Sequence, residues 1–220
     1  MTDTAGLLRL LSWLSPVFPT GGFAYSSGLE AAAQTGVVKD ETELGEWLSA
    51  LLQYGSLRND ALFLVSAFEH NRNPASLQEI AELAVALAGS SRRYLECTAQ
   101  GDAFIKAVRN WPKLNDLNFP KPCPLAVAVG AAAGRSTINL QSTLNAYLHA
   151  FVSNQLQAAI RLSIIGQSAA ARLLAQLEAS ILAMVETVEN GSLEDLGSAA
   201  IMADIMAMKH EELEGRLFRS

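Results

Sequence analysis

Apolar residues recur along most of this 220-residue chain at the spacing of an α-helix, which limits its possible folds more than any other feature. In three long stretches, residues 44–52, 144–160 and 173–185, they follow the i, i+3, i+4, i+7 spacing of one helix face. Alternating, strand-like runs are almost absent. The only contender, LAVAV at 125–129, contains alanines and is followed by glycine, which favours a helix. The pattern predicts an all-α fold.

The sequence also predicts a single domain. Four of the seven prolines lie between Trp111 and Pro124. Because proline lacks a backbone donor and clashes with the preceding helical turn, this stretch is expected to be a loop. The two flanking parts do not differ in composition, so the loop is interpreted as a long connection inside one bundle. Residues 1–220 are therefore expected to form one helical bundle-like domain of about eight to ten helices.

Charge and cysteine content exclude several classes of protein. The formal net charge is −6 and no cluster of Lys or Arg is present, whereas nucleic-acid binding needs clustered positive charge. Cys97 and Cys123 lack metal-like spacing and fit a reducing compartment. Asp3 stands where a signal peptide would be basic, and the longest apolar window, 124–134, is too short to cross a bilayer. We predict a cytoplasmic protein that binds neither nucleic acid nor membranes.

One stretch, SPVFPTGGFAYSSGLE at residues 15–30, differs from the helical patterns on either side. Its prolines stiffen the backbone, and its glycine pair allows a tight reversal that would present Phe23 and Tyr25 in a defined way. Exposed, rigid aromatic rings are good interface anchors, although either ring could equally be packed in the core. We interpret the stretch as a candidate docking loop.

Two capping boxes are predicted. Asp40 and Glu43 precede the apolar pattern at 44–52 with the spacing of a helix N-terminus, and Ser27 and Glu30 have the same S-x-x-E spacing. A capping box would account for Ser27 and Glu30 without any functional role.

Signatures of catalysis and metal binding are weak. AYSSG is not a nucleophile elbow, because Ala24 replaces its first glycine, and GGFAYSSG lacks the lysine of a P-loop. His70, His149 and His210 are distant in sequence. His210 and Glu214 share a helical face and could hold a metal weakly, but acidic residues near a chain end are more often simply solvated. We predict a protein that is not an enzyme and that has no cofactor.

The last residues, RLFRS, place an apolar pair between two arginines. Chain ends usually fray, but this pattern is also typical of a tail that docks on a partner. Charged residues make up only 17% of the chain, so much apolar surface must be hidden inside the fold or against partners.

Five segments spread over nearly the whole chain occur in the order found in one known family. They are residues 7–36, RYLECTAQGDAF, PLAVAVGAAAG, AAIRLSIIGQ and KHEELEGRLFRS. They resemble, in turn, the N-terminal signature, the E-x-T-x-x-G helix, the P-x-x-x-G segment, the basic-leucine-x-proline-leucine-glycine-glutamine segment and the RLFRS ending of the urease accessory protein UreF family. Ile164 replaces the proline of the fourth segment.

The resemblance implies an all-helical homodimer with no chemistry of its own. It implies a complex with the scaffold protein UreD, also called UreH, and with the GTPase UreG. In the family this complex supports GTP-dependent nickel insertion into apo-urease, so the chain would be a metallocentre-assembly chaperone that bridges the two proteins and modulates the GTPase.

The resemblance also implies three groups of contact residues. The GTPase-facing surface would contain Phe23, Tyr25, Ser26, Glu30 and Arg161. The dimer interface would contain Asn145 and His149. The scaffold-docking tail, residues 208–220, would use His210, Arg216, Leu217, Phe218 and Arg219. Nothing in the sequence shows that Arg161 reaches a nucleotide as an arginine finger would.

Two other functions stay open at this point. A helical small-molecule-binding or hydrolytic enzyme would use the Gly21–Glu30 loop, with a serine of that loop brought near His149. A direct nickel carrier would use His210 together with Glu211 or Glu214.

Overall fold

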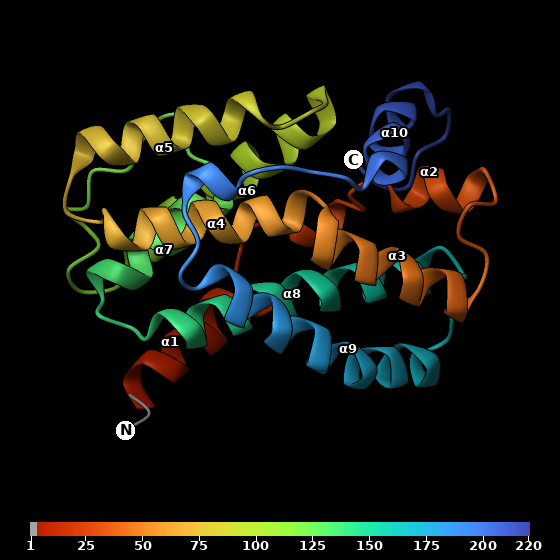
Figure 1. Cartoon of the computed structure of the whole chain (residues 1–220), viewed down its shortest axis with the longest axis horizontal. Helices are drawn as coiled ribbons and strands as arrows, with labels where there is room; N and C mark the ends of the chain where they lie inside the picture. The colour runs from red at the N-terminus through yellow and green to blue at the C-terminus, as the bar shows by residue number, and fades with distance from the viewer. Residues whose placement is uncertain (1–3) are drawn as a thin grey trace.

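The computed structural model describes residues 4–220, and over that range it contains ten α-helices, three short 3₁₀ helices and no β-strand. The all-α prediction is confirmed (Figure 1). The α-helices are α1 (Thr4–Trp13), α2 (Leu29–Gln34), α3 (Glu41–Tyr54), α4 (Ser56–Glu69), α5 (Pro74–Ala86), α6 (Ser91–Val108), α7 (Leu125–Arg135), α8 (Leu140–Arg161), α9 (Gln167–Val188) and α10 (Ile201–Lys209). The 3₁₀ helices are η1 (Gly22–Ala24), η2 (Leu193–Asp195) and η3 (His210–Glu212). Asp3 lies outside the described residues.

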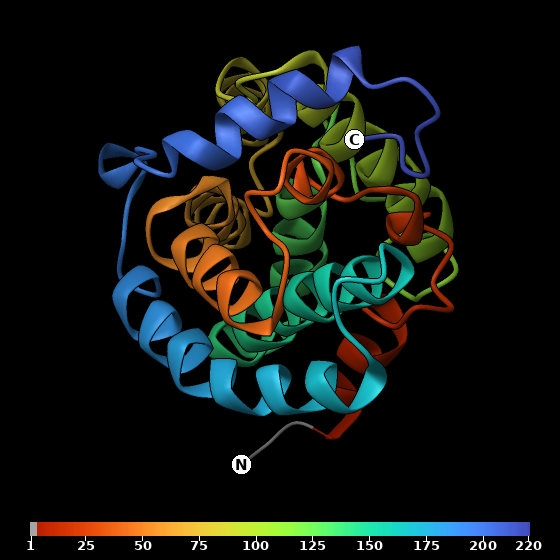
Figure 2. The same cartoon turned by 90° about the vertical axis from the view of Figure 1, so that its right-hand side faces the viewer.

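The central helix is α7, which is buried at every residue from Ala126 to Ala133 and packs along α4 (Figures 1 and 2). Glycines allow this close approach. A Cβ atom at Gly130 would lie 2.3 Å from the carbonyl oxygen of Leu64, and one at Gly134 would lie 2.4 Å from that of Phe68. The small residues of the 125–134 segment therefore let two helix backbones come together.

The proline-rich stretch is a loop, as predicted, because no α-helix lies between the end of α6 at Val108 and the start of α7 at Leu125. An aromatic cluster ties it to the N-terminal region. The ring of Trp13 meets those of Phe104 and Trp111 edge-on, with centroids 6.0 and 5.9 Å apart. The cluster fixes the end of α1, from which the docking loop starts.

Helix α9 is the one described helix with the length and mean hydropathy of a membrane span. One such helix is weak evidence, because a core helix passes the same test. Its residues Leu173, Leu177, Ile181 and Met184 are buried, and the helix packs against α3 and α8. These four apolar residues of α9 thus pack inside the fold.

The capping box predicted before α3 is confirmed in its main contact. Asp40 Oδ1 accepts a hydrogen bond from the backbone N–H of Glu43 at 3.0 Å. The carboxylate of Glu43 reaches back to the N–H of Lys39, at 2.7 Å, instead of that of Asp40.

Candidate functional site

The N-terminal loop and the C-terminal tail lie side by side, next to α2 (Figures 1 and 2). The N–H of Arg219 donates to the carbonyl of Ala24, and the N–H of Ser26 donates to the carbonyl of Ser220, both at 2.8 Å. The hydroxyl of Ser26 donates to the same Ser220 carbonyl. The loop near the N-terminus and the tail at the C-terminus are therefore hydrogen-bonded to each other.

The loop turns sharply at its glycine pair, as predicted. Gly21 has a φ of 72°, a left-handed conformation that suits glycine, and residues 22–24 form the η1 turn. The side chain of Phe23 is 70% exposed, whereas that of Tyr25 is only 3% exposed. The turn thus presents one aromatic ring to solvent and buries the other in the core.

Glu30 holds the tail. Its carboxylate is 2% exposed and accepts hydrogen bonds from Leu217 N–H at 2.7 Å, Phe218 N–H at 3.1 Å and His210 Nε2 at 2.8 Å. Leu217 and Phe218 lie almost the length of the chain away. Hydrogen bonds to a charged acceptor are the stronger kind, so this one side chain fixes the tail at three points.

The capping box predicted for Ser27 and Glu30 is wrong. Ser27 and Gly28 both have positive φ, at 52° and 85°, and this backbone turns the Ser27 side chain away from α2. Its hydroxyl donates to Glu96 Oε1 at 2.8 Å instead. The cap comes from one residue earlier, because the N–H of Glu30 donates to Ser26 Oγ at 3.4 Å.

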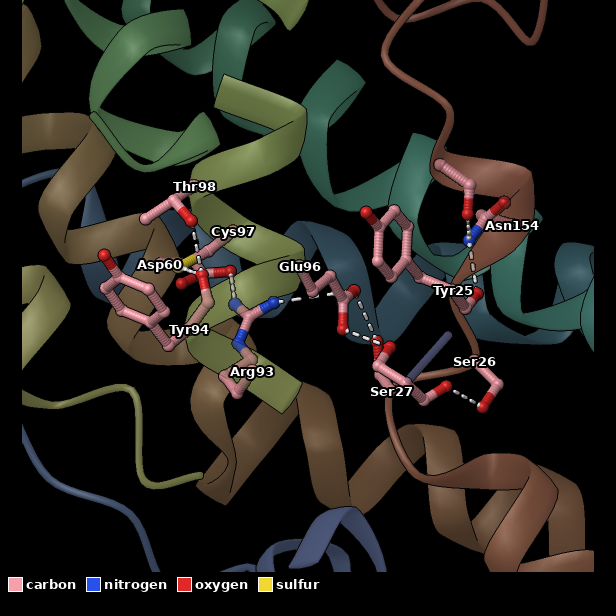
Figure 3. A network of polar contacts seen from close by, with 12 residues as sticks. Tyr25, Ser26, Ser27, Asp60, Arg93, Tyr94, Glu96, Cys97, Thr98 and Asn154 are labelled. Carbon is pink, nitrogen blue, oxygen red and sulfur yellow. Dashed lines mark hydrogen bonds and ion pairs between the residues drawn. The ribbon is translucent and has the colours of Figure 1, made fainter. Parts of the chain in front are cut away.

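A second buried carboxylate, Glu96 on α6, also joins the loop to the tail. Its Oε1 accepts from Ser27, and its Oε2 accepts from the hydroxyl of Ser220 at 2.8 Å. Figure 3 shows Glu96 between Ser27 on one side and Arg93 on the other, whose Nη1 is 3.6 Å from Oε1. The sequence offered Glu96 only as part of the E-x-T-x-x-G segment and gave it no role.

Arg93 extends this network into the core. It forms an ion pair with Asp60 on α4 (Figure 3). The hydroxyl of Tyr147 donates to the same carboxylate at 3.2 Å. Burial opposes the charge of Arg93, but Asp60 and Glu96 hold the pKa of its guanidinium well above the ordinary value. The charged guanidinium thus balances the buried carboxylate of Glu96 and the partly buried carboxylate of Asp60.

Cys97 lies beside this network, and its thiol is expected to be unreactive in the folded protein. Burial raises its pKa to about 11, and the nearby Arg93 only partly offsets this. That shift from 9.0 lowers the thiolate fraction about 100-fold at pH 8. Cys123 is also buried, and burial raises the pKa of its thiol as well. Iodoacetamide should therefore label neither cysteine of the native protein at pH 8.

The same protein unfolded in guanidinium is the control, and both cysteines should then react. Rapid labelling of the native chain would contradict the burial of these thiols.

Because the pKa of the Cys97 thiol is higher in the folded protein than in the unfolded one, the thiol of the unfolded state loses its proton first. The free energy of unfolding should therefore fall as the pH rises from about 9 towards 11.

Arg161, at the end of α8, contacts both the loop and the tail. Its Nη1 donates to the carbonyl of Phe23, and its Cζ lies 4.4 Å from the ring centroid of Phe218. The ring of Phe218 is buried under it, whereas Leu217 is half exposed and the side chains of Arg216 and Arg219 face solvent.

His210 is buried and is not placed as a metal ligand. Its Nε2 contacts Glu30, and Nδ1 has no partner. Glu211 is used elsewhere, because it accepts from the N–H and hydroxyl of Ser91 at the start of α6, and these bonds lower its pKa. Within residues 4–220 no group of three or more His, Cys, Asp and Glu side chains could hold a metal ion. The geometry gives the nickel-carrier alternative no support.

Asn145 and His149 lie on α8. His149 is exposed, and the amide of Asn145 donates to the carbonyl of Gln141 at 3.0 Å. Ser26 is fully buried and its hydroxyl is bonded to Ser220. A small cavity of about 20 Å³ lies beside Asp60 and Arg93, and neither Ser26 nor His149 lines it. Within residues 4–220 the hydroxyls of Ser26 and Ser27 bond to Ser220 and Glu96 and not to a histidine, so the geometry gives the hydrolase alternative no support.

Comparisons with known proteins agree on one family. A family model described as UreF matches residues 38–178. A protein of Mesorhizobium japonicum named urease accessory protein UreF is 48% identical over 223 residues, covering 100% of both chains. Its namesake from Agrobacterium fabrum is 47% identical over 219 residues, covering 100% of this chain and 98% of the relative. The protein named urease accessory protein UreF 1 of Brucella anthropi is 47% identical over 220 residues, with 100% and 96% coverage. These alignments include both the loop and the tail.

Proposed function

The chain belongs to the UreF family of urease accessory proteins, and we propose that it assists urease maturation through protein contacts and without catalysis of its own. It bridges the scaffold protein UreD (UreH) and the GTPase UreG during GTP-dependent nickel insertion into apo-urease, and it modulates the GTPase. It works in the cytoplasm as a homodimer, with Asn145 and His149 in the dimer interface. The observation that carries the proposal is the seating of the tail on the loop by Glu30.

A bridging role needs two contact surfaces that are held together. The loop presents Phe23, and the adjacent tail presents Leu217, which is 52% exposed. Large exposed apolar side chains on a rigid frame are suited to protein contacts. The buried carboxylates of Glu30 and Glu96 connect the two surfaces in one polar network.

The residues of the GTPase-facing surface then divide into two roles. Phe23 lies at the surface, where a partner can reach it, and Arg161 is exposed beside it. Tyr25, Ser26 and Glu30 are buried and shape that surface from below. In the scaffold-docking tail, Phe218 and His210 are likewise buried anchors, and the exposed members are Arg216, Leu217 and Arg219.

The test is a co-purification of the chain with UreD and UreG. Phe23→Ala is expected to weaken UreG recruitment about tenfold or more, because an exposed aromatic anchor is removed. Val17→Ala is the matched control, since Val17 is a 90% exposed apolar residue of the same loop. A chain truncated after Lys209 should lose UreD.

Thermal unfolding must show that all three variants fold. Unchanged UreG recruitment by Phe23→Ala would contradict the assignment of the loop, and retention of UreD by the truncated chain would contradict that of the tail. If the full-length chain binds neither protein, the proposed function is wrong.

A further inference from the structure

The turn that carries Phe23 is held by a single face of α8. Asn154 Nδ2 donates to the carbonyls of Gly22, at 3.1 Å, and Tyr25, at 3.4 Å. Arg161 lies about two helical turns further along the same face and donates to the carbonyl of Phe23. The backbone of the turn is thus bound at three carbonyls by two side chains of one helix.

These two side chains differ in what supports them. The contacts of Asn154 run directly from α8 to the turn. The guanidinium of Arg161 also lies over the ring of Phe218, with Cζ 4.4 Å from the centroid. A long, surface-lying arginine loses rotamer freedom when it is fixed, and stacking on an aromatic ring offsets that loss. The bond from Arg161 to Phe23 therefore depends on whether the tail is seated.

We propose that Arg161 is a positioning residue that couples the tail to the Phe23 turn. When Phe218 is seated, the guanidinium is held flat and fixes the carbonyl of Phe23, so that the exposed ring points in one direction. When the tail leaves, Arg161 loses its support and the turn relaxes. The inference rests on the proposed function in one respect, that Phe23 faces the GTPase. In this role Arg161 acts through Phe23 and does not touch the partner.

The first experiment needs no partner. Hydrogen exchange is measured at the amides of Ala24 and Tyr25, which close the turn onto Gly21 and Gly22. Arg161→Gln is expected to speed their exchange roughly fivefold, because the cation over the ring is lost. Unchanged exchange in Arg161→Gln would overturn the inference.

Two further variants show whether the effect passes through the ring. Phe218→Leu keeps an apolar side chain and the N–H that binds Glu30, but it removes the aromatic face. It should speed exchange in the turn about as much as Arg161→Gln and add nothing in the double variant. Arg172→Gln is the control, because Arg172 is an exposed arginine paired only with Glu41 on the surface, and it should leave the turn unchanged. Additive effects of Arg161→Gln and Phe218→Leu would overturn the coupling.

The second experiment measures UreG affinity for Phe23→Ala, Arg161→Gln and the double variant. A positioning role predicts that the double variant binds no more weakly than Phe23→Ala alone. Additive losses would mean that Arg161 touches the GTPase directly, which would overturn the inference. If Phe23→Ala alone has no effect, the proposed GTPase surface fails, while the exchange measurements still decide the role of Arg161.

Discussion

Replacing Gly130 by alanine is expected to lower the free energy of unfolding by about 3 kcal/mol or more. The new Cβ atom would lie 2.3 Å from the carbonyl oxygen of Leu64 and 3.0 Å from its carbonyl carbon. Both are backbone atoms in the interior of α4, so neither can move without disturbing that helix. Alanine favours an α-helix over glycine by about 1 kcal/mol, but the clash between α4 and α7 outweighs this gain. Urea unfolding followed by circular dichroism measures the effect.

Gly197→Ala is the matched control, because nothing lies within 4 Å of the position that its Cβ atom would take and its φ is not positive. Its free energy of unfolding should stay within about 0.5 kcal/mol of the wild type, as for most surface substitutions. A Gly130→Ala protein as stable as the Gly197→Ala protein would show that α4 and α7 do not pack backbone to backbone.

Most helices could be predicted because each carries its own periodic pattern. Leu44, Trp47 and Leu48 follow that spacing, and all three are buried on α3. The local pattern failed for α10, where Ile201 and Met202 are exposed while Ala203 and Met206 are buried. When apolar residues lie on both faces of a helix, the sequence does not indicate which face is buried. For α10 the buried face is set by its packing against α2 and α6.

The sequence predicted only those features of the candidate site that depend on residues close together in the chain. The glycine pair predicted the turn at Gly21, but the same reasoning could not decide between Phe23 and Tyr25 as the exposed ring. The S-x-x-E spacing gave Glu30 a local partner in Ser27, whereas its true partners lie in the last residues of the chain. Contacts between distant segments leave no periodic signal, and Glu96 was left without a role for the same reason.

Replacing Glu30 by glutamine is expected to release the tail. The carboxylate offers two acceptor oxygens to three donors: Leu217 N–H, Phe218 N–H and His210 Nε2. An amide of the same size keeps one oxygen and turns an NH₂ group towards the remaining donors. Each bond to the charged acceptor contributes about 1.5–3 kcal/mol, and a buried donor left unpaired costs about 1–3 kcal/mol. The seated state of the tail should therefore lose about 3 kcal/mol of stabilisation. This shifts its equilibrium with the released state roughly a hundredfold towards release.

Hydrogen exchange at the amides of Leu217 and Phe218 measures this release directly. Their protection should fall roughly a hundredfold in Glu30→Gln, while that of α4 and α7 stays unchanged, because release of the tail leaves the packing of α4 on α7 in place. Glu212→Gln is the control, since Glu212 is an exposed glutamate of the same tail and its replacement removes the same formal charge. Unchanged protection in Glu30→Gln would show that Glu96 and the backbone contacts of Ser26 hold the tail without it.

The same variant shows what the seated tail does in the complex. If the scaffold protein binds the tail as it is seated here, UreD binding should weaken in proportion to the fall in the seated fraction, by at most about a hundredfold. If UreD instead binds the released tail, Glu30→Gln should strengthen its binding, because the cost of unseating has already been removed. Weaker recruitment of UreG by the same variant would follow in the first case, because the turn that presents Phe23 loses the support of Arg161 and Phe218. Unchanged binding of both partners by a protein whose tail is shown to be free would contradict the use of the seated tail as a docking surface.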